Sequence, residues 1–441
     1  MGHSSRLRWT RSLVAALVIA GVAVAGAAPQ GARAQQPRAI VNLTFWSWVP
    51  NLNTSVDLFN STHPGIHVTW NKVVAGNLGT YAKMFAALKA NNAPDLGQVE
   101  YQFLPTFEAT GGLVDMAPYG AAAYKNQFVP WTWSQSTLGN AVYAIPQDSG
   151  PMAMYYRADL FKKYNIAVPT TWAQYAAAAA TLHKANPSLY ITDFPPKDAG
   201  WFIGLLWQRG ARLFRINGNA WKVAINDPNA TAVAQYWQNL LSQKLVRTEP
   251  DFEQSWNHDL QTGGAATWIS AVWGANTIIN SATGTSGDWR VAPMPQWTAG
   301  QTVYGNWGGS TTVVFKSTKH PKEASEFAAF LNSNLHSVTN MIDPLKGAAL
   351  YPALKAGLDQ PAVVQPVAFY GGQKINQVFN AASAKVDVNF QWGPTMDQVF
   401  ADMSDDFSNA VNGKITLPQA LNQLQQSTVS HMQKLGFTVQ Q

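Results

Sequence analysis

The chain of 441 residues contains no cysteine. This absence excludes disulfide bonds, thiolate metal sites and cysteine nucleophiles. It also excludes lipid attachment at an N-terminal cysteine. An exported protein without such an anchor fits a periplasm bounded by an outer membrane better than the surface of a single-membrane cell.

Charged residues are scarce, at 12% of the chain against 46% hydrophobic residues. A disordered chain would carry more charge, so the composition predicts a packed protein, long enough for two domains. The formal net charge is +6, but four arginines precede Gln35 with no acid among them. Without them a net charge of about +2 remains. Near neutrality and scattered lysines give no electrostatic reason to expect a nucleic acid partner.

Only one long apolar run occurs, and it is short for a membrane span. Leu13–Ala28 is a run of 16 residues, whereas a span needs about 20. Three arginines precede this run, and Ala32-Arg33-Ala34 supplies small residues before Gln35. The pattern is typical of a signal peptide, so we expect residues 1–34 to be removed on export.

Motifs of common enzyme and metal chemistry are also absent. The sequence has no Gly-x-Ser-x-Gly elbow and neither of the glycine-rich phosphate loops. His63 and His67 are four residues apart, but Pro64 lies between them, so they cannot share a helical face as zinc ligands do. We therefore expect no catalytic residue, no metal and no cofactor.

The periodicity of apolar residues predicts alternating strands and helices. Apolar residues alternate at 41–45 and 66–70, as in strands, and residues 81–88 carry a helical stripe. Thr171 and Gln174 form a capping-box pattern before an alanine-rich segment, and Asp227-Pro228 is a second helix start. This alternation predicts an α/β fold. No linker divides the chain, so two lobes would be interleaved.

Several motifs follow one another in a characteristic order. They are YAIPQDSG at 143–150, MYYRADLF at 154–161, VPTTW at 168–172, TGGAATWIS at 262–270, NWGGS at 306–310 and KHPKEA at 319–324. Together they resemble the family 1 extracellular solute-binding proteins over residues 40 to 435. That group contains maltose-, multiple-sugar- and glycerol-3-phosphate-binding proteins of ATP-driven importers. Arg157 stands where the family usually has asparagine, at a turn that begins a helix.

The resemblance implies a two-lobed periplasmic-binding-protein fold of type II, with a hinge of two or three crossing strands. The implied N-lobe covers residues 40–148 plus about 306–350, and the C-lobe covers 149–305 plus about 351–441. The implied function is that of the substrate-binding component of an ABC transporter. Such a monomeric periplasmic protein binds a mono- to oligosaccharide between its lobes and delivers it to membrane permeases, without acting as an enzyme.

A sugar site needs flat apolar rings and a few polar groups, because a sugar presents hydroxyls at its rim and C–H patches on its faces. The family motifs imply that Trp273 and Trp392 stack on the sugar from the second lobe, and that Glu100 and Asp148 accept hydrogen bonds from hydroxyls. Glycines at 308 and 309 would allow close approach or flexing of the backbone. The expected ligand-binding residues are Trp48, Glu100, Tyr101, Asp148, Trp201, Trp273, Trp307, Gly308, Gly309 and Trp392.

Five alternatives stay open at this point. Any one of these tryptophans could be a core residue, and Glu100 and Asp148 could cap a helix or form a salt bridge. The same two carboxylates could belong to a secreted glycoside hydrolase, although no hydrolase motif accompanies them. Arg209 and Arg212 could pair with a phosphate, as in glycerol-3-phosphate binding, although we expect both on a solvated turn. Finally, the chain could be a lectin-like or chemosensory binding module that serves no transporter, since the same closed lobes could dock on a receptor.

Overall fold

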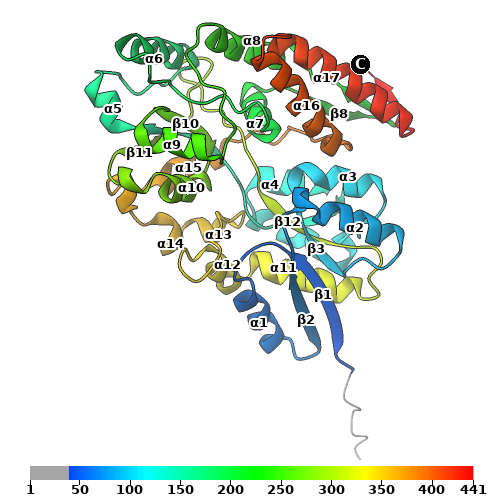
Figure 1. Cartoon of the computed structure of the whole chain (residues 1–441). Helices are drawn as coiled ribbons and strands as arrows, with labels where there is room; N and C mark the ends of the chain where they lie inside the picture. The colour runs from blue at the N-terminus through cyan, green and yellow to red at the C-terminus, as the bar shows by residue number, and fades with distance from the viewer. Residues whose placement is uncertain (1–38, 441) are drawn as a thin grey trace, which may run out of the picture. The chain divides into compact units, whose positions relative to one another are not determined.

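The computed structural model describes residues 39–440 (Figure 1). The expected signal peptide therefore lies outside the described residues. None of the helices within 39–440 is long and apolar enough to cross a membrane.

A five-stranded sheet has the order β2-β1-β3-β12-β6. Strand β1 pairs in parallel with β2 and β3, as expected from strand–helix alternation, whereas β12 is antiparallel to β3 and β6. Strand β12 comes from a distant part of the sequence, so the chain leaves this sheet and returns to its middle. The strands are β1 (Val41–Ser47), β2 (Ile66–Lys72), β3 (Leu96–Glu100), β6 (Ala144–Pro146) and β12 (Ser310–Val314).

Helices cover both faces of this sheet. On one face the fully buried Phe45 of β1 packs edge-on against Phe327, at 5.5 Å between ring centroids, and Phe327 in turn contacts Phe59. Helices α1, α11 and α12 contact one another there. The helices are α1 (Asn53–Thr62), α2 (Thr80–Lys89), α3 (Leu104–Ala109), α4 (Pro130–Gln135), α11 (Pro321–Ser333) and α12 (Leu335–Ile342).

A separate three-stranded antiparallel sheet has the order β10-β7-β11. Its central strand is almost entirely buried, and Tyr155 from that strand donates hydrogen bonds to the carbonyl oxygens of Ala271 and Val272. Helix α15 packs on β7, while α16 and α17 lie beside α7 and α8 (Figure 1). The strands are β7 (Met152–Arg157), β10 (Thr267–Ala271) and β11 (Trp289–Ala292).

Helix starts in this second region follow the sequence signals. Thr171 and Gln174 form the predicted capping box of α6, and the Asp227 carboxylate accepts the backbone N–H of Ala230 at the start of α8. The helices are α5 (Ala158–Lys163), α6 (Trp172–Ala185), α7 (Ala199–Arg209), α8 (Pro228–Ser242), α9 (Gln254–Thr262), α10 (Gly274–Ser281), α13 (Lys355–Leu358), α14 (Pro361–Val364), α15 (Ile375–Ser383), α16 (Met396–Val411) and α17 (Leu417–Lys434).

Short elements complete the described part of the chain. The small strands are β4 (Thr137–Leu138), β5 (Ala141–Val142), β8 (Phe214–Asn217), β9 (Ala220–Val223) and β13 (Val439–Gln440). The 3-10 helices are η1 (Gly76–Leu78), η2 (Tyr101–Phe103), η3 (Ala117–Tyr119), η4 (Ala121–Gln127), η5 (Thr283–Thr285) and η6 (Ala368–Tyr370).

Three segments that connect the two sheets are hydrogen-bonded to one another. The backbone N–H of Trp307 donates to the Gly150 carbonyl at 2.9 Å, and that of Ser149 donates to the Tyr351 carbonyl at 3.0 Å. The Asn306 side chain accepts the Gly150 N–H at 2.9 Å. Four elements meet around these crossings, namely the C-terminal ends of β3 and β6 and the first turns of α7 and α10. The candidate site lies there.

Candidate functional site

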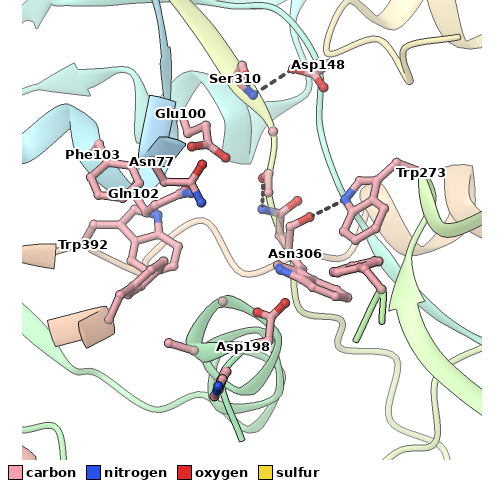
Figure 2. Close-up of a pocket in the computed structure, with 18 residues that line it drawn as sticks. Asn77, Glu100, Gln102, Phe103, Asp148, Asp198, Trp273, Asn306, Ser310 and Trp392 are labelled. Atoms are coloured by element: carbon pink, nitrogen blue, oxygen red, sulfur yellow. Dashed lines mark hydrogen bonds between the residues drawn. The ribbon is translucent and has the colours of Figure 1, made fainter. Parts of the chain in front are cut away.

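A cavity of about 430 Å³ lies beside the crossing segments (Figure 2). Its volume falls within the range of small-molecule sites in proteins. Carboxylates, aromatic rings and glycine backbone all contribute to its wall. Seven of the ten residues predicted from the sequence line it, namely Glu100, Asp148, Trp273, Trp307, Gly308, Gly309 and Trp392.

Two carboxylates occupy the side of the cavity that the five-stranded sheet provides. Glu100 ends β3 and is paired in register with Ser310 of β12, whose backbone N–H donates to Asp148 Oδ1 at 2.8 Å. The hydroxyl of Tyr81 donates to Glu100 Oε2 at 3.0 Å. These contacts fix both side chains and leave other oxygen lone pairs of each carboxylate unused.

Burial changes the acidity of both groups. It raises the pKa of Asp148 to about 7, and the neighbouring negative charge of Glu100 adds to the effect, while the hydrogen bond from Ser310 opposes it. Burial likewise raises the pKa of Glu100, against the hydrogen bonds from Tyr81 and Gln102. Each carboxylate is therefore held where its charge is poorly solvated, so a ligand that donates hydrogen bonds would stabilise it.

Aromatic rings form the wall on the side of the three-stranded sheet. The rings of Trp273 and Trp307 lie 4.5 Å apart at an interplanar angle of 66°, and Trp273 Nε1 donates to the Trp307 carbonyl at 3.0 Å. Phe252 packs beside both rings and leaves 51% of its surface exposed. Its φ of 69° is unusual for a bulky residue, so the surrounding loop holds the backbone of Phe252 in a strained conformation.

A second aromatic group faces Trp273 from the opposite side of the cavity (Figure 2). It centres on Trp392, which packs edge-on against Trp207 at 6.0 Å and against Phe400 at 6.4 Å. Phe400 in turn contacts Phe103, which follows the five-stranded sheet. A flat ligand in the cavity would therefore meet rings on two sides.

The first turn of α7 opens onto the cavity. Asp198 caps this helix by accepting the backbone N–H of Trp201 at 2.8 Å, and burial raises its pKa to about 6. Gly200 also lines the cavity, and a Cβ atom there would lie 2.9 Å from Trp307 Nε1. The close approach of α7 to the Trp307 ring thus depends on a residue without a side chain.

The two predicted glycines shape the backbone between the walls. Gly308 and Gly309 have φ values of 81° and 95°, in the region that other residues avoid. A Cβ atom on Gly309 would lie 2.8 Å from the Tyr101 ring and 3.0 Å from the Asp148 carbonyl oxygen. Only glycine at these two positions therefore allows the segment to pass this close to its neighbours.

Three predicted ligand-binding residues do not line the cavity. Trp201 is 1% exposed, and its Nε1 donates to the Ile269 carbonyl at 2.9 Å, so the ring belongs to the core beside Trp237. Tyr101 is buried, and its hydroxyl donates to the Asp148 carbonyl. Trp48 is half-buried and meets Tyr81 edge-on. Tyr101 supports the backbone of Asp148, and Trp48 packs on the tyrosine that holds Glu100.

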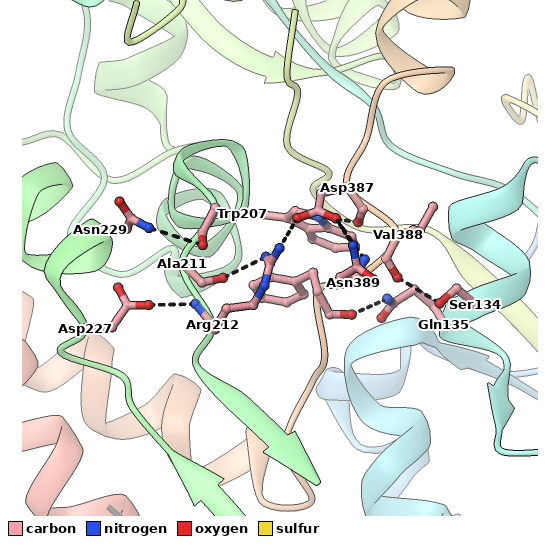
Figure 3. Close-up of polar contacts among 12 residues, drawn as sticks. Ser134, Gln135, Trp207, Ala211, Arg212, Asp227, Asn229, Asp387, Val388 and Asn389 are labelled. Atoms are coloured by element: carbon pink, nitrogen blue, oxygen red, sulfur yellow. Dashed lines mark hydrogen bonds and ion pairs between the residues drawn. The ribbon is translucent and has the colours of Figure 1, made fainter. Parts of the chain in front are cut away.

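The two arginines considered for phosphate binding lie away from the cavity. Arg212 forms an ion pair with Asp387, and its backbone N–H donates to Asp227 at 2.8 Å (Figure 3). The Arg209 guanidinium lies over the Trp297 ring at 5.0 Å. Arg209 ends α7 and Arg212 follows it, whereas the first turn of this helix faces the cavity. Both side chains are engaged in packing, so the expected solvated turn was wrong.

Sequence reasoning missed several cavity residues. Asp198 carried a usable signal, because an aspartate before an apolar helical stripe is a typical N-cap. Phe252 carried none, since it belongs to neither a helical stripe nor an alternating strand. The remaining residues that line the cavity are Asn77, Gln102, Phe103, Lys197, Ala199, Gly200, Asn306, Ser310 and Phe400. Within residues 39–440 no cluster of histidine and acidic side chains suits a metal ion.

A family model described as bacterial extracellular solute-binding protein matches residues 46–334 of the chain. Among curated proteins, the arabinooligosaccharide-binding protein of Bacillus subtilis (strain 168) is 24% identical over 333 residues. That alignment covers 69% of this chain and 73% of the relative.

Two solved structures are similar over nearly the whole described chain. The galacto-N-biose-/lacto-N-biose I-binding protein of the ABC transporter from Bifidobacterium longum, in complex with lacto-N-biose, is 29% identical with a TM-score of 0.80. The match covers 91% of this chain and 99% of that one. The ABC transporter associated binding protein from B. animalis subsp. lactis Bl-04, in complex with beta-1,6-galactobiose, is 26% identical with a TM-score of 0.75, covering 91% and 100%.

Proposed function

Because the chain belongs to the family of bacterial extracellular solute-binding proteins, we propose that it binds a sugar in this cavity and delivers it to the permease of an ABC importer. Its fold is the two-lobed α/β fold of periplasmic binding proteins, as predicted from the sequence. The observation that carries the proposal is the pairing of aromatic rings with buried carboxylates in one cavity beside the crossing segments.

The chemistry of the cavity suits a polyhydroxylated ligand. The rings of Trp273, Trp307 and Trp392 offer flat apolar surface for the C–H faces of a sugar ring. Glu100 and Asp148 offer carboxyl oxygens as acceptors for hydroxyl groups, and these hydrogen bonds are strongest when the carboxyl group is ionised. Each group alone is common in proteins, and their combination in one cavity favours a saccharide.

The lobes that would close on the sugar are assigned as follows. Residues 40–148 plus about 306–350 form the lobe around the five-stranded sheet, and residues 149–305 plus about 351–441 form the other. The three crossing segments would serve as the hinge. A bound sugar shifts the balance between open and closed forms only by its different affinity for the two.

The wider assignment follows from the family. We propose that the mature protein is a periplasmic monomer that leaves its ligand chemically intact. The three relatives named above are binding proteins, two of them described with ABC transporters. No observation in the described residues favours hydrolysis of a glycosidic bond.

A thermal-shift screen tests the proposal. The panel contains lactose, lacto-N-biose, beta-1,6-galactobiose, arabinooligosaccharides, monosaccharides and glycerol 3-phosphate. At least one saccharide should raise the melting temperature, because a ligand that binds only the folded state stabilises it. Solution scattering should show compaction with that saccharide, and product analysis should recover it unchanged. Absence of any shift across the panel would contradict sugar binding, and cleavage would contradict a pure binding role.

A further inference from the structure

The charges that line the cavity are unequal. Glu100, Asp148 and Asp198 are acidic, and Lys197, whose side chain is exposed, is the one basic residue among the lining residues. Within residues 39–440, the ion pairs of the structure involve none of these four side chains. The carboxylates therefore have no fixed cation to balance them.

The groups with which proteins usually bind anions are missing or already in use. Arginine is the side chain best suited to phosphate and carboxylate, and no arginine lines the cavity. A helix N-terminus also attracts anions, but the first turn of α7 is occupied by the Asp198 carboxylate. An incoming anion would have to compete with a negative charge that is already in place.

Two further donors near the cavity are satisfied within the protein. The backbone N–H of Ser310 donates to Asp148, and the side-chain amide of Asn306 donates to the Gly308 carbonyl at 2.7 Å. The carboxylates of Glu100, Asp148 and Asp198, in contrast, line the cavity (Figure 2) and have more acceptor positions than these hydrogen bonds use. The lining thus carries an excess of negative charge, in surroundings where charge interactions are stronger than in water.

We propose that the cavity selects its saccharide by charge: it binds neutral sugars, binds more tightly those that carry a protonated amine, and rejects those that carry a carboxylate or a phosphate. This inference rests on the proposed function, because it assumes that the ligand is a sugar. It excludes the polyol phosphate that Arg209 and Arg212 suggested, since both side chains are engaged elsewhere.

The selection should depend on pH in a defined direction. Burial raises the pKa of Asp148 to about 7 and that of Asp198 to about 6. The charge of Glu100 adds to the rise for Asp148, while the hydrogen bonds from Trp201 and Gly200 oppose the rise for Asp198. Tyr101 lies against Asp148, and burial and the charge of Asp198 in turn raise the pKa of the neighbouring Asp251. Asp148 and Asp198 are therefore mainly neutral at pH 5 and charged at pH 8, so discrimination should grow as pH rises. An ordinary carboxylate is charged throughout this range and would give no change.

A matched ligand series provides the test. The panel sugar with the largest thermal shift is prepared with one free primary hydroxyl intact, replaced by an amine, or oxidised to a carboxylate, and this is repeated on each ring that has such a hydroxyl. Calorimetry at pH 5 and pH 8 gives the three affinities. At pH 8 we expect the carboxylate to bind at least about a hundredfold more weakly than the parent, since like charges repel strongly in such a site. We expect the amine to bind more tightly than the parent, and both differences to shrink at pH 5.

Variants assign the effect to the carboxylates. Asp148→Asn keeps an oxygen that accepts the Ser310 N–H, so the fold should be retained, and the ratio of carboxylate to parent affinity at pH 8 should rise on the order of tenfold. Asp57→Asn, at an exposed position on α1, removes the same charge far from the cavity and should leave that ratio unchanged. Equal binding of carboxylate and parent by the unaltered protein, or an unchanged ratio in Asp148→Asn, would overturn the inference alone. Failure of every parent sugar to bind would overturn the proposed function as well.

Discussion

The two walls of the cavity differ in chemistry and in origin. The five-stranded sheet supplies Glu100 at the end of β3 and Asp148 just after β6, each held by a hydrogen bond from a neighbour. The three-stranded sheet region supplies rings, with Trp273 after β10 and Phe252 before α9. Neither wall alone would hold a sugar well, because rings give little orientation and carboxylates give little contact area. Affinity therefore depends on both walls meeting the ligand together.

The largest effect should come from the aromatic wall. Trp273→Ala removes a ring that contacts Trp307 and the cavity, and should weaken sugar binding at least about tenfold, or about 1.4 kcal/mol. Calorimetry with the panel sugar measures this change. Trp70→Ala is the matched control, since Trp70 lies half-buried on β2 outside the cavity and should leave affinity unchanged. Equal losses in both variants would mean that Trp273 acts through stability alone.

The acidic wall should contribute less for a neutral sugar. Glu100→Gln keeps the acceptor for the Tyr81 hydroxyl and removes the charge, so only the strength of hydrogen bonds to the ligand changes. We expect binding to weaken about fivefold, close to 1 kcal/mol. Titration of the variant with the parent sugar checks this value. If Glu100→Gln lost more affinity than Trp273→Ala, the acidic wall would contribute more to binding than the aromatic wall.

Phe252 tests whether the aromatic wall extends beyond the tryptophans. Because half of the ring is exposed, Phe252→Ala should weaken binding only about threefold, or about 0.7 kcal/mol. The melting temperature of the Phe252→Ala variant without ligand should stay near that of the unaltered protein. Phe252→Leu keeps apolar bulk without a flat face. If stacking contributes, its affinity should lie between those of the unaltered protein and Phe252→Ala. Unaltered affinity in Phe252→Ala would confine the aromatic wall to Trp273 and Trp307.

The smallest effect concerns stability without ligand. The pKa of Asp148 is about 7 in the folded protein, against about 3.9 in an unfolded chain. The folded state therefore holds the proton more tightly, and the free energy of unfolding should fall as pH rises from about 4 to about 7. Asp148→Asn should reduce this fall, seen as a melting temperature that changes by a few degrees less between pH 5 and pH 8. Asp57→Asn should keep the pH dependence of the unaltered protein. If the melting temperatures of both variants changed equally between pH 5 and pH 8, the raised pKa of Asp148 would be contradicted.

Local signals predicted much of the scaffold. The capping pattern at Thr171 and the Asp-Pro start at 227 begin helices where expected, because caps satisfy backbone groups within a single turn. The alternating segments at 41–45 and 66–70 form two paired parallel strands, as their alternation predicted. These features depend on residues close in sequence, so the sequence alone can display them.

The choice among tryptophans could not be made in this way. Trp201 and Trp273 both lie near the start of a helix, yet one is sealed in the core and the other lines the cavity. Periodicity distinguishes buried from exposed positions, and it does not distinguish a core from the wall of a cavity, since both are apolar. The difference lies in which distant segment packs against each ring.

The sequence by itself determined the family, the α/β elements and the glycines at 308 and 309, because motifs and backbone requirements are local properties of the chain. The tertiary structure decided which side chains share one cavity, that Asp198 fills the helix end facing it, and that Arg212 is engaged with Asp387 away from it. These outcomes depend on contacts between segments far apart in the sequence. The energy of burying a charge or a ring is set by such contacts, and no short stretch of sequence contains them.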